Sequence, residues 1–222
     1  MDRRAIKAKA KEFAFQNKWN IWKPLLLYMV IAFAVSFCLT LIIGMLKLPQ
    51  FVASLLELAM GLALMPMAIG LASYCLKLVN GKEVDAMTEL LSRYKDGSTF
   101  PIIKTMFLAG LFIFLWSLLF VIPGLIKSYA YSMSFYLMAD DENLGGNDAI
   151  TKSKELMKGH KWDLFVLQLS FIGWILLSML TCGVLTVFYV GPYMQMAQLI
   201  WYEENIKQKE EPAQEVVAEQ AE

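Results

Sequence analysis

The sequence is poor in charged residues and in the residue types that build most catalytic and metal sites. Charged residues occupy 18% of its 222 positions and it has a single histidine, whereas soluble domains carry roughly one quarter charged residues. The three cysteines lie in or beside apolar runs without CxxC spacing, which argues against a zinc site or a disulfide framework. No GxSxG, HExxH or phosphate-binding glycine loop occurs. We therefore expect no enzyme, no cofactor and no bound metal.

Two polar features are weak candidates for a metal site. His160 stands between Lys158 and Lys161 with no second ligand near it in the sequence, and it is interpreted as a polar residue at a membrane surface. The acidic run Asp140-Asp141-Glu142 lacks the ligand spacing of a calcium-binding loop. Capping of the neighbouring helices is the better interpretation of these acids.

Long apolar runs are the dominant feature. The chain is 58% hydrophobic with a mean hydropathy of +0.50, and its apolar residues gather in runs near the ~18 residues that indicate a membrane span. The predicted fold class is all-α, a polytopic membrane helix bundle of six transmembrane helices arranged as three hairpins in a single domain, residues 1–202. The predicted spans are 24–46, 51–76, 102–121, 125–139, 163–181 and 184–202. The fourth is short, so it is expected to tilt or to sit in a hairpin whose tip lies below the membrane surface.

A charged segment precedes each hairpin and is predicted to form an amphipathic interfacial helix. These segments are 1–23, 77–103 and 148–158, the last with Asn147 as N-cap and Gly159 as C-cap. In the middle segment the predicted apolar face carries Val84, Met87, Leu90, Leu91 and Tyr94, with Glu89 and Arg93 mostly elsewhere. Two interpretations stay open: three copies of one unit, or simply the usual pattern of chains that re-enter the membrane.

The basic residues predict an orientation. Eighteen of the 20 lie in segments 1–23, 77–104, 140–162 and 203–222, and basic loops stay cytoplasmic. Both termini are therefore predicted to be cytoplasmic, the first span to be an uncleaved anchor, and residues 203–222 to be an acidic, disordered cytoplasmic tail.

Glu57 and Lys127 are the two charges well inside apolar runs. An unpaired charge in lipid is costly, so such residues usually face a bundle interior or a wet cavity. The favoured hypothesis is an intramembrane ion pair between the first two hairpins, or snorkelling of Lys127. The alternative is a substrate or ion site.

Lysines of the charged segments are candidate contacts to anionic lipid of the inner leaflet, because each basic residue near the surface contributes about 1 kcal/mol. The candidates are Lys7, Lys11, Lys18, Lys152, Lys154, Lys158 and Lys161. Zero net charge gives no indication of nucleic acid as a partner.

Three stretches resemble one bacterial membrane family. They are IPGLIKSYAYSMSFYLMADDEN, DAITKSKELMKGHKWDLFVLQLSFIGWILLS and GPYMQMAQLIWYEE, and the similarity is most specific from Ile122 to Tyr202. The family is known only as a domain of unknown function, number nine-seven-five, and occurs mainly in Gram-positive bacteria. The resemblance implies a multi-pass plasma-membrane protein and brings no activity and no catalytic residues.

The sequence favours a non-enzymatic membrane component that binds lipid, a hydrophobic peptide or a membrane-protein partner. The alternative is a small transporter or channel with Glu57 and Lys127 lining the path. Prolines at 66, 123 and 192 favour transport, whereas the very short outer loops count against it.

Overall fold

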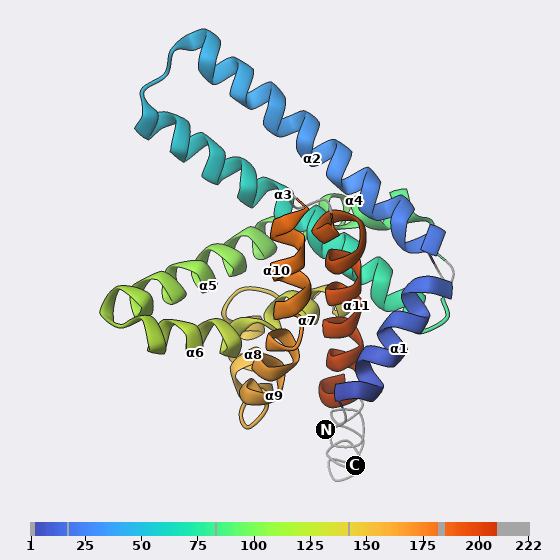
Figure 1. Cartoon of the computed structure of the whole chain (residues 1–222). Coiled ribbons are helices and arrows are strands. Elements are labelled where there is room, and N and C mark those ends of the chain that lie inside the picture. Colours follow the sequence, from blue (N-terminus) through green and yellow to red (C-terminus); the bar gives the residue numbers. More distant parts are fainter. Residues whose placement is uncertain (1–2, 17, 83, 142, 182–184, 208–222) are drawn as a thin grey trace, which may run out of the picture. The chain divides into compact units, whose positions relative to one another are not determined.

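Helices make up all the regular structure in the described part of the chain. The computed structural model describes residues 3–16, 18–82, 84–141, 143–181 and 185–207. The helices are α1 (Arg3–Gln16), α2 (Lys18–Leu46), α3 (Gln50–Val79), α4 (Ala86–Lys95), α5 (Thr99–Leu119), α6 (Val121–Tyr131), α7 (Ser134–Asp140), α8 (Asn147–Leu156), α9 (Lys161–Leu169), α10 (Ile172–Leu180), η1 (Thr186–Val190), α11 (Gly191–Tyr202) and η2 (Glu203–Lys207) (Figure 1). The two η elements are π-helices. The all-helical prediction is confirmed for these residues.

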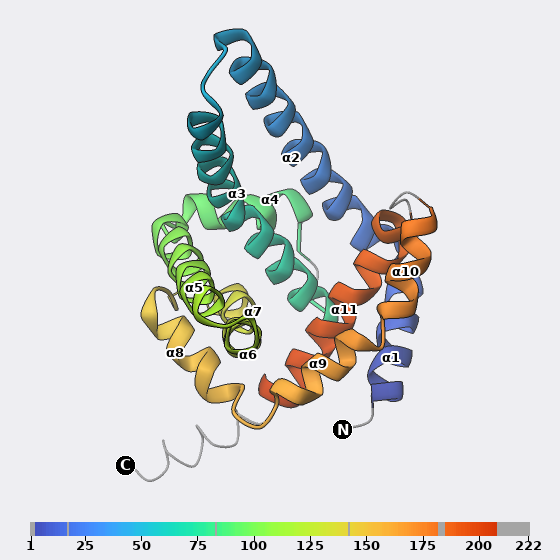
Figure 2. The same cartoon turned by 60° about the vertical axis from the view of Figure 1, so that its left-hand side comes forward.

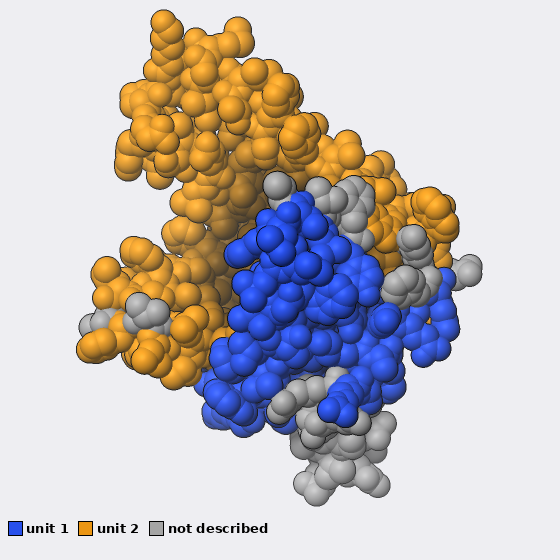
Figure 3. Space-filling model, viewed as in Figure 1, with its two compact units in different colours: residues 1–18, 154–222 blue, residues 19–153 orange. Residues whose placement is uncertain are grey.

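The chain divides into two compact units (Figure 3). The terminal unit holds residues 1–18 and 154–222, and the central unit holds residues 19–153. The first helix, α1, thus belongs to the same unit as α11 near the other end of the chain.

Four described helical stretches are long and apolar enough to cross a membrane. They are Trp19–Leu46, Gln50–Val79, Thr99–Leu118 and Lys161–Leu180. In the first, none of the most apolar window is buried inside the protein, and Phe33, Phe37 and Met45 are among its exposed large side chains. Figures 1 and 2 show α2 and α3 as a long hairpin joined by a short turn. The predicted first and second spans are therefore found as helices, but six spans in three hairpins are not confirmed.

The predicted fourth span, 125–139, is not one helix. It divides between α6 and α7, and the division falls at Ser132 and Met133. The Ser132 hydroxyl donates to the carbonyl of Tyr129 at 2.9 Å, and the Ser134 hydroxyl to that of Tyr131 at 2.6 Å. Such local hydroxyl bonds compete with the helical ladder. With 11 residues, α6 rises only about 16 Å, short of the ~30 Å of a bilayer core.

The predicted sixth span, 184–202, is also irregular. Residues 182–184 lie outside the described residues, and the remainder is η1 followed by α11. The predicted tail begins with a further helical turn, η2, whose Glu203 and Ile206 are buried. Residues 208–222 lie outside the described residues, so their disorder stays a prediction.

Pro66 divides α3 into an exposed and a buried half. Before it, nearly all side chains are exposed or half-buried; from Pro66 to Leu76 all are buried except half-buried Ala68. The buried half packs against α4, α5 and α7. This part of α3 forms the core of the central unit.

The three short helices occur where charged segments predict them, and each packs against a hairpin. α4 packs on α3, the second arm of the hairpin before it. In α8, Ile150 packs with Ala109 and Ala130 of the α5–α6 hairpin. No hairpin precedes α1, and this helix packs on α11 near the other end of the chain. The repeat of one unit stays a prediction, because α4 and α8 pack on the hairpin that precedes them, whereas α1 packs on a helix near the other end of the chain.

Candidate functional site

A buried ionic network lies at the centre of the central unit. The Lys77 ammonium lies 2.7 Å from Oε1 of Glu89, and the Ser73 hydroxyl donates to the same oxygen at 2.7 Å. Arg93 donates from Nη2 to the carbonyl of Ala139 at 2.8 Å and, more weakly, to Oγ of Ser73 at 3.4 Å. The network therefore ties α3 to α4 and to the end of α7.

Local sequence places these four side chains. Ser73 and Lys77 lie four residues apart on α3, and Glu89 and Arg93 four apart on α4, so each pair shares one helical face. Gly70 lets the helices approach closely, because a Cβ there would lie 2.7 Å from the carbonyl oxygen of Glu89.

Asp85 fixes the start of α4. Its carboxylate accepts from the backbone N–H of Thr88 at 2.9 Å and from the Thr88 hydroxyl at 2.8 Å. These hydrogen bonds hold the pKa of Asp85 below its usual value. The cap satisfies an N–H at the helix start that has no intrahelical partner.

The predicted face of α4 is only partly right: Leu90 is fully buried as predicted, but the buried side also carries two charged residues. Arg93 is fully buried and Glu89 nearly so, whereas Met87 and Tyr94 are exposed. Burying a charge is favourable only when it is paired and hydrogen-bonded, and the partners come from α3 and α7. One feature of the sequence could have indicated this burial. Ser73 and Lys77 on the preceding helix have the same four-residue spacing as Glu89 and Arg93, so the two pairs can face each other.

A second polar cluster lies in the terminal unit, where the helix of residues 161–180 is broken. α9 ends at Leu169 and α10 begins at Ile172. The Lys7 ammonium donates to the carbonyl oxygen of Ser170 at 3.2 Å and to its hydroxyl at 3.1 Å. It also lies 4.3 Å from the ring centroid of Phe171. Lys7 therefore stabilises the negative end of α9, and partial burial lowers the pKa of its ammonium.

Aromatic and hydroxyl side chains surround this break. The Tyr193 hydroxyl donates to the backbone carbonyl of Lys7 at 3.3 Å, and its ring meets that of Phe171 edge-on with centroids 5.0 Å apart. Further along, the hydroxyls of Ser178 and Thr186 are hydrogen-bonded, and Thr186 begins the π-helix η1. Broken helices and π-helices often mark functional positions in membrane proteins.

The structure places Glu57 and Lys127 in different surroundings. Glu57 is exposed on the first half of α3, whereas the Lys127 ammonium lies 4.7 Å from the ring centroid of Trp116. Lys127 thereby gains a cation–π contact within the α5–α6 hairpin. The ion pair between the two charges stays a prediction.

The candidate lipid-binding lysines differ in their surroundings. The Lys7 ammonium is directed at the helix break, while Lys11, Lys154 and Lys158 are exposed and Lys152 and Lys161 are half-buried. Of Lys18 only the backbone is described. These lysines do not all lie in one unit: Lys152 belongs to the central unit, whereas Lys154, Lys158 and Lys161 are neighbours in sequence within the terminal unit.

His160 contacts protein groups. Its Nδ1 lies 3.6 Å from a carboxylate oxygen of Asp163, and its ring meets that of Trp201 edge-on with centroids 6.3 Å apart. Within the described ranges, no three His, Cys, Asp or Glu side chains cluster as metal ligands would. Glu142 of the acidic run lies outside the described residues.

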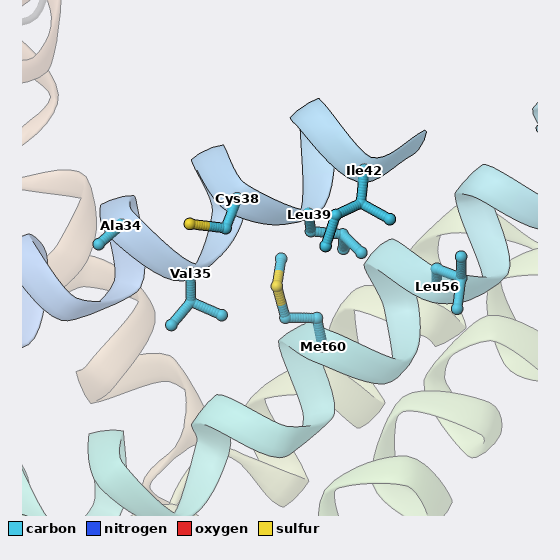
Figure 4. Close-up of a pocket in the computed structure, with 7 residues that line it drawn as sticks. All are labelled: Ala34, Val35, Cys38, Leu39, Ile42, Leu56 and Met60. Atoms are coloured by element: carbon cyan, nitrogen blue, oxygen red, sulfur yellow. The ribbon is translucent and has the colours of Figure 1, made fainter. Parts of the chain in front are cut away.

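An apolar groove of about 430 Å³ separates the two arms of the first hairpin. It is lined by Ala34, Val35, Cys38, Leu39 and Ile42 of α2 and by Leu56 and Met60 of α3 (Figure 4). Met60 extends from α3 toward the side chains of α2. Ligand pockets of similar size usually add a few polar groups that orient the ligand. This lining is apolar throughout, so the two polar clusters are the better candidate sites.

Long apolar helices with exposed apolar side chains and short, charged helices packed beside them are typical of an integral membrane protein. Residues 1–127 and 118–210 both match the family described as Protein of unknown function (DUF975). The chain belongs to this family, as its sequence resemblance predicts. No curated protein and no solved structure matches the chain.

Proposed function

We propose that this protein is a non-enzymatic membrane component that binds anionic lipid of the inner leaflet. One observation carries the proposal: the segment from Lys154 to Trp162 joins exposed basic residues to an exposed aromatic ring. Lys154 and Lys158 are exposed, and Trp162 keeps 69% of its surface accessible. Tryptophan and lysine favour the headgroup level. The exposed apolar side chains of α10, including Ile172 and Met179, follow in the same unit.

The lipid preference is measurable by native mass spectrometry. Protein released from mixed phosphatidylglycerol and phosphatidylcholine membranes is expected to retain phosphatidylglycerol preferentially. Replacing Lys158 and Lys161 by glutamine removes about 2 kcal/mol of attraction, or roughly a 30-fold preference. The matched control replaces Lys82 and Lys95 of the central unit. Equal retention in both double variants would refute this lipid-binding surface.

We further propose six hydrophobic segments in three hairpins, each preceded by an amphipathic interfacial helix, with both termini cytoplasmic in the plasma membrane of a Gram-positive bacterium. The basic residues support this orientation. Single cysteines at Gln50, Phe120 and Thr181, near the three turns, are expected to react with a membrane-impermeant reagent added outside. A cysteine at Lys95 is expected to react only after the membrane is opened. A cysteine at Gln50 labelled only from inside would overturn the topology.

A membrane-protein partner is a further possibility within the same class of function. Purification from native membranes in mild detergent, followed by mass spectrometry of proteins and lipids, separates the two cases. A stoichiometric protein would indicate an accessory subunit. Lipid at a fixed ratio, lost when the basic residues are neutralised, would indicate a protein that acts with lipid alone.

The second candidate function is a small transporter or channel. The break between α9 and α10 favours it, because discontinuous helices often bind ions or substrates in transporters. Glu57 and Lys127 are the charges proposed to line the path. Rubidium flux into proteoliposomes, compared between the wild type and Glu57→Gln, tests this candidate. Flux in the wild type that is lost in the variant would support it, and absence of flux in both would count against a monovalent-cation path.

A further inference from the structure

We propose that the break between α9 and α10 is a recognition site for a primary ammonium group. Lys7 occupies the site in this structure, and an aminophospholipid headgroup is the ligand that competes with it. The Lys7 ammonium meets three different groups there: the Ser170 carbonyl at 3.2 Å, the Ser170 hydroxyl at 3.1 Å, and the face of Phe171, whose centroid is 4.3 Å away. These contacts define the chemistry of the ligand.

The contacts select an ammonium that carries hydrogens. A carbonyl and a hydroxyl oxygen accept N–H donors, of which a primary ammonium has three. The aromatic face adds attraction for positive charge, and the carbonyl at the C-terminal end of α9 carries the negative end of the helix dipole. A quaternary ammonium would keep the aromatic contact but lacks the hydrogens that the two oxygens require. The site should therefore prefer ethanolamine to choline headgroups.

The site is open enough for a ligand to replace the Lys7 ammonium. Lys7 is only half-buried and Ser170 is exposed, so the ammonium reaches the break from the surface. Among the described side chains of α1, Ile6 and Ala10 are fully buried, and Lys9 forms an ion pair with Glu204. Displacement of the Lys7 ammonium can leave these contacts in place, so it costs little buried apolar surface.

The level of α1 in the membrane favours a lipid headgroup. α1 exposes Arg4, Lys9, Lys11 and Glu12, and these charges would be costly in the hydrocarbon core. α1 therefore lies at the headgroup level, and the Lys7 side chain reaches from this level to Ser170, nine residues along the apolar stretch that begins at Lys161. At this level the abundant primary ammonium groups belong to aminophospholipids such as phosphatidylethanolamine.

The proposal does not depend on the anionic-lipid surface proposed above. That surface uses the charge of Lys158 and Lys161, whereas this site uses Ser170 and Phe171. Loss of phosphatidylglycerol preference in the double lysine variant would leave the ammonium site unaffected, so the two proposals fail separately.

Chemical rescue tests the site directly. Lys7→Ala should lower the Tm of the detergent-solubilised full chain, and ethylammonium chloride should restore most of the loss with a saturable dose dependence. Tetramethylammonium chloride at the same ionic strength should not. In Lys7→Ala/Phe171→Leu, half-saturation should need about two- to fivefold more ethylammonium, the ratio that corresponds to a cation–π contact. Lys11→Ala is the matched control, because Lys11 is an exposed lysine on the same helix. Equal rescue by both salts, or rescue of Lys11→Ala, would overturn the proposal.

A second measurement uses the wild-type chain and distinguishes lipid from a soluble amine. In nanodiscs, acetylation of Lys7 relative to Lys11 is followed by mass spectrometry. Phosphatidylethanolamine should raise the Lys7 to Lys11 ratio above its value in phosphatidylcholine, because the headgroup displaces the Lys7 ammonium. Rescue by ethylammonium with an unchanged acetylation ratio would assign the site to soluble amines and refute the lipid headgroup as its ligand. No rescue and no change in the ratio would refute the site altogether.

Discussion

Replacing Gly70 by alanine is expected to force α4 away from α3. A Cβ at this position would lie 2.7 Å from the carbonyl oxygen of Glu89 and 2.8 Å from that of Leu90. Both neighbours are backbone atoms inside α4, so no side chain can rotate to make room. Glu89 also belongs to the ionic network, and the displacement would stretch its 2.7 Å contact with Lys77.

The magnitude follows from a comparison with Gly61 on the same helix. A Cβ at Gly61 would meet open space. Gly→Ala in a helix gains about 1 kcal/mol from helix propensity, and this gain is common to both positions. Only Gly70→Ala adds overpacking, which costs about 1–3 kcal/mol. The two variants should therefore differ in unfolding free energy by about 1–3 kcal/mol, with Gly70→Ala the less stable.

Thermal unfolding in one detergent provides the assay. For a chain of this length, 1 kcal/mol corresponds to about 2–4 °C in Tm, so Gly70→Ala should unfold about 2–12 °C below Gly61→Ala. Since the helix-propensity contribution cancels, the difference isolates the contact between α3 and α4. Equal Tm values for the two variants would refute the close packing of these helices.

Three further predictions concern the charged groups. Arg93→Met should destabilise the protein by about 1–3 kcal/mol in chemical denaturation, because the buried carbonyl of Ala139 loses its charged donor; a change near zero would show that this contact does not matter. The pKa of the Asp85 carboxylate is lowered, so this group should stabilise the fold fully above its ordinary pKa of 3.8 and lose this contribution as the pH falls through the lowered value. Asp85→Asn retains a hydrogen-bond acceptor but does not titrate, so it should flatten the pH dependence of Tm in that range. If Glu57 and Lys127 pair in the membrane, each single neutralisation should reduce stability more than the double change does, and small additive effects would rule the pair out.

Much of the helical organisation could be predicted from residues close together in the sequence. The first hairpin follows from two apolar runs separated by Lys47-Leu48-Pro49, and the structure has α2 and α3 on either side of this turn. The short helices α1, α4 and α8 occur at the charged segments with helical periodicity. Helix formation and the preference of apolar runs for lipid depend on consecutive residues, so both are visible in the sequence.

The interruptions were harder to predict. The break between α6 and α7 coincides with serine hydroxyls that donate hydrogen bonds to nearby carbonyls. The break between α9 and α10 coincides with Ser170, whose carbonyl accepts a hydrogen bond from Lys7. A hydroxyl in an apolar run is compatible with a continuous helix, because it can bond within the helix or point elsewhere. Composition alone does not distinguish these outcomes.

The sequence by itself determined the helical class, the long apolar helices, the positions of the charged helices and the family. Only the tertiary structure decided which face of α4 is buried, that Glu89 and Arg93 belong to an ionic network, and that Lys7 reaches a residue 163 positions away. The physical reason is the range of the interactions. Helix propensity and hydropathy act between neighbours in the chain, whereas the burial of a charge is favourable only where packing brings its partner from another helix.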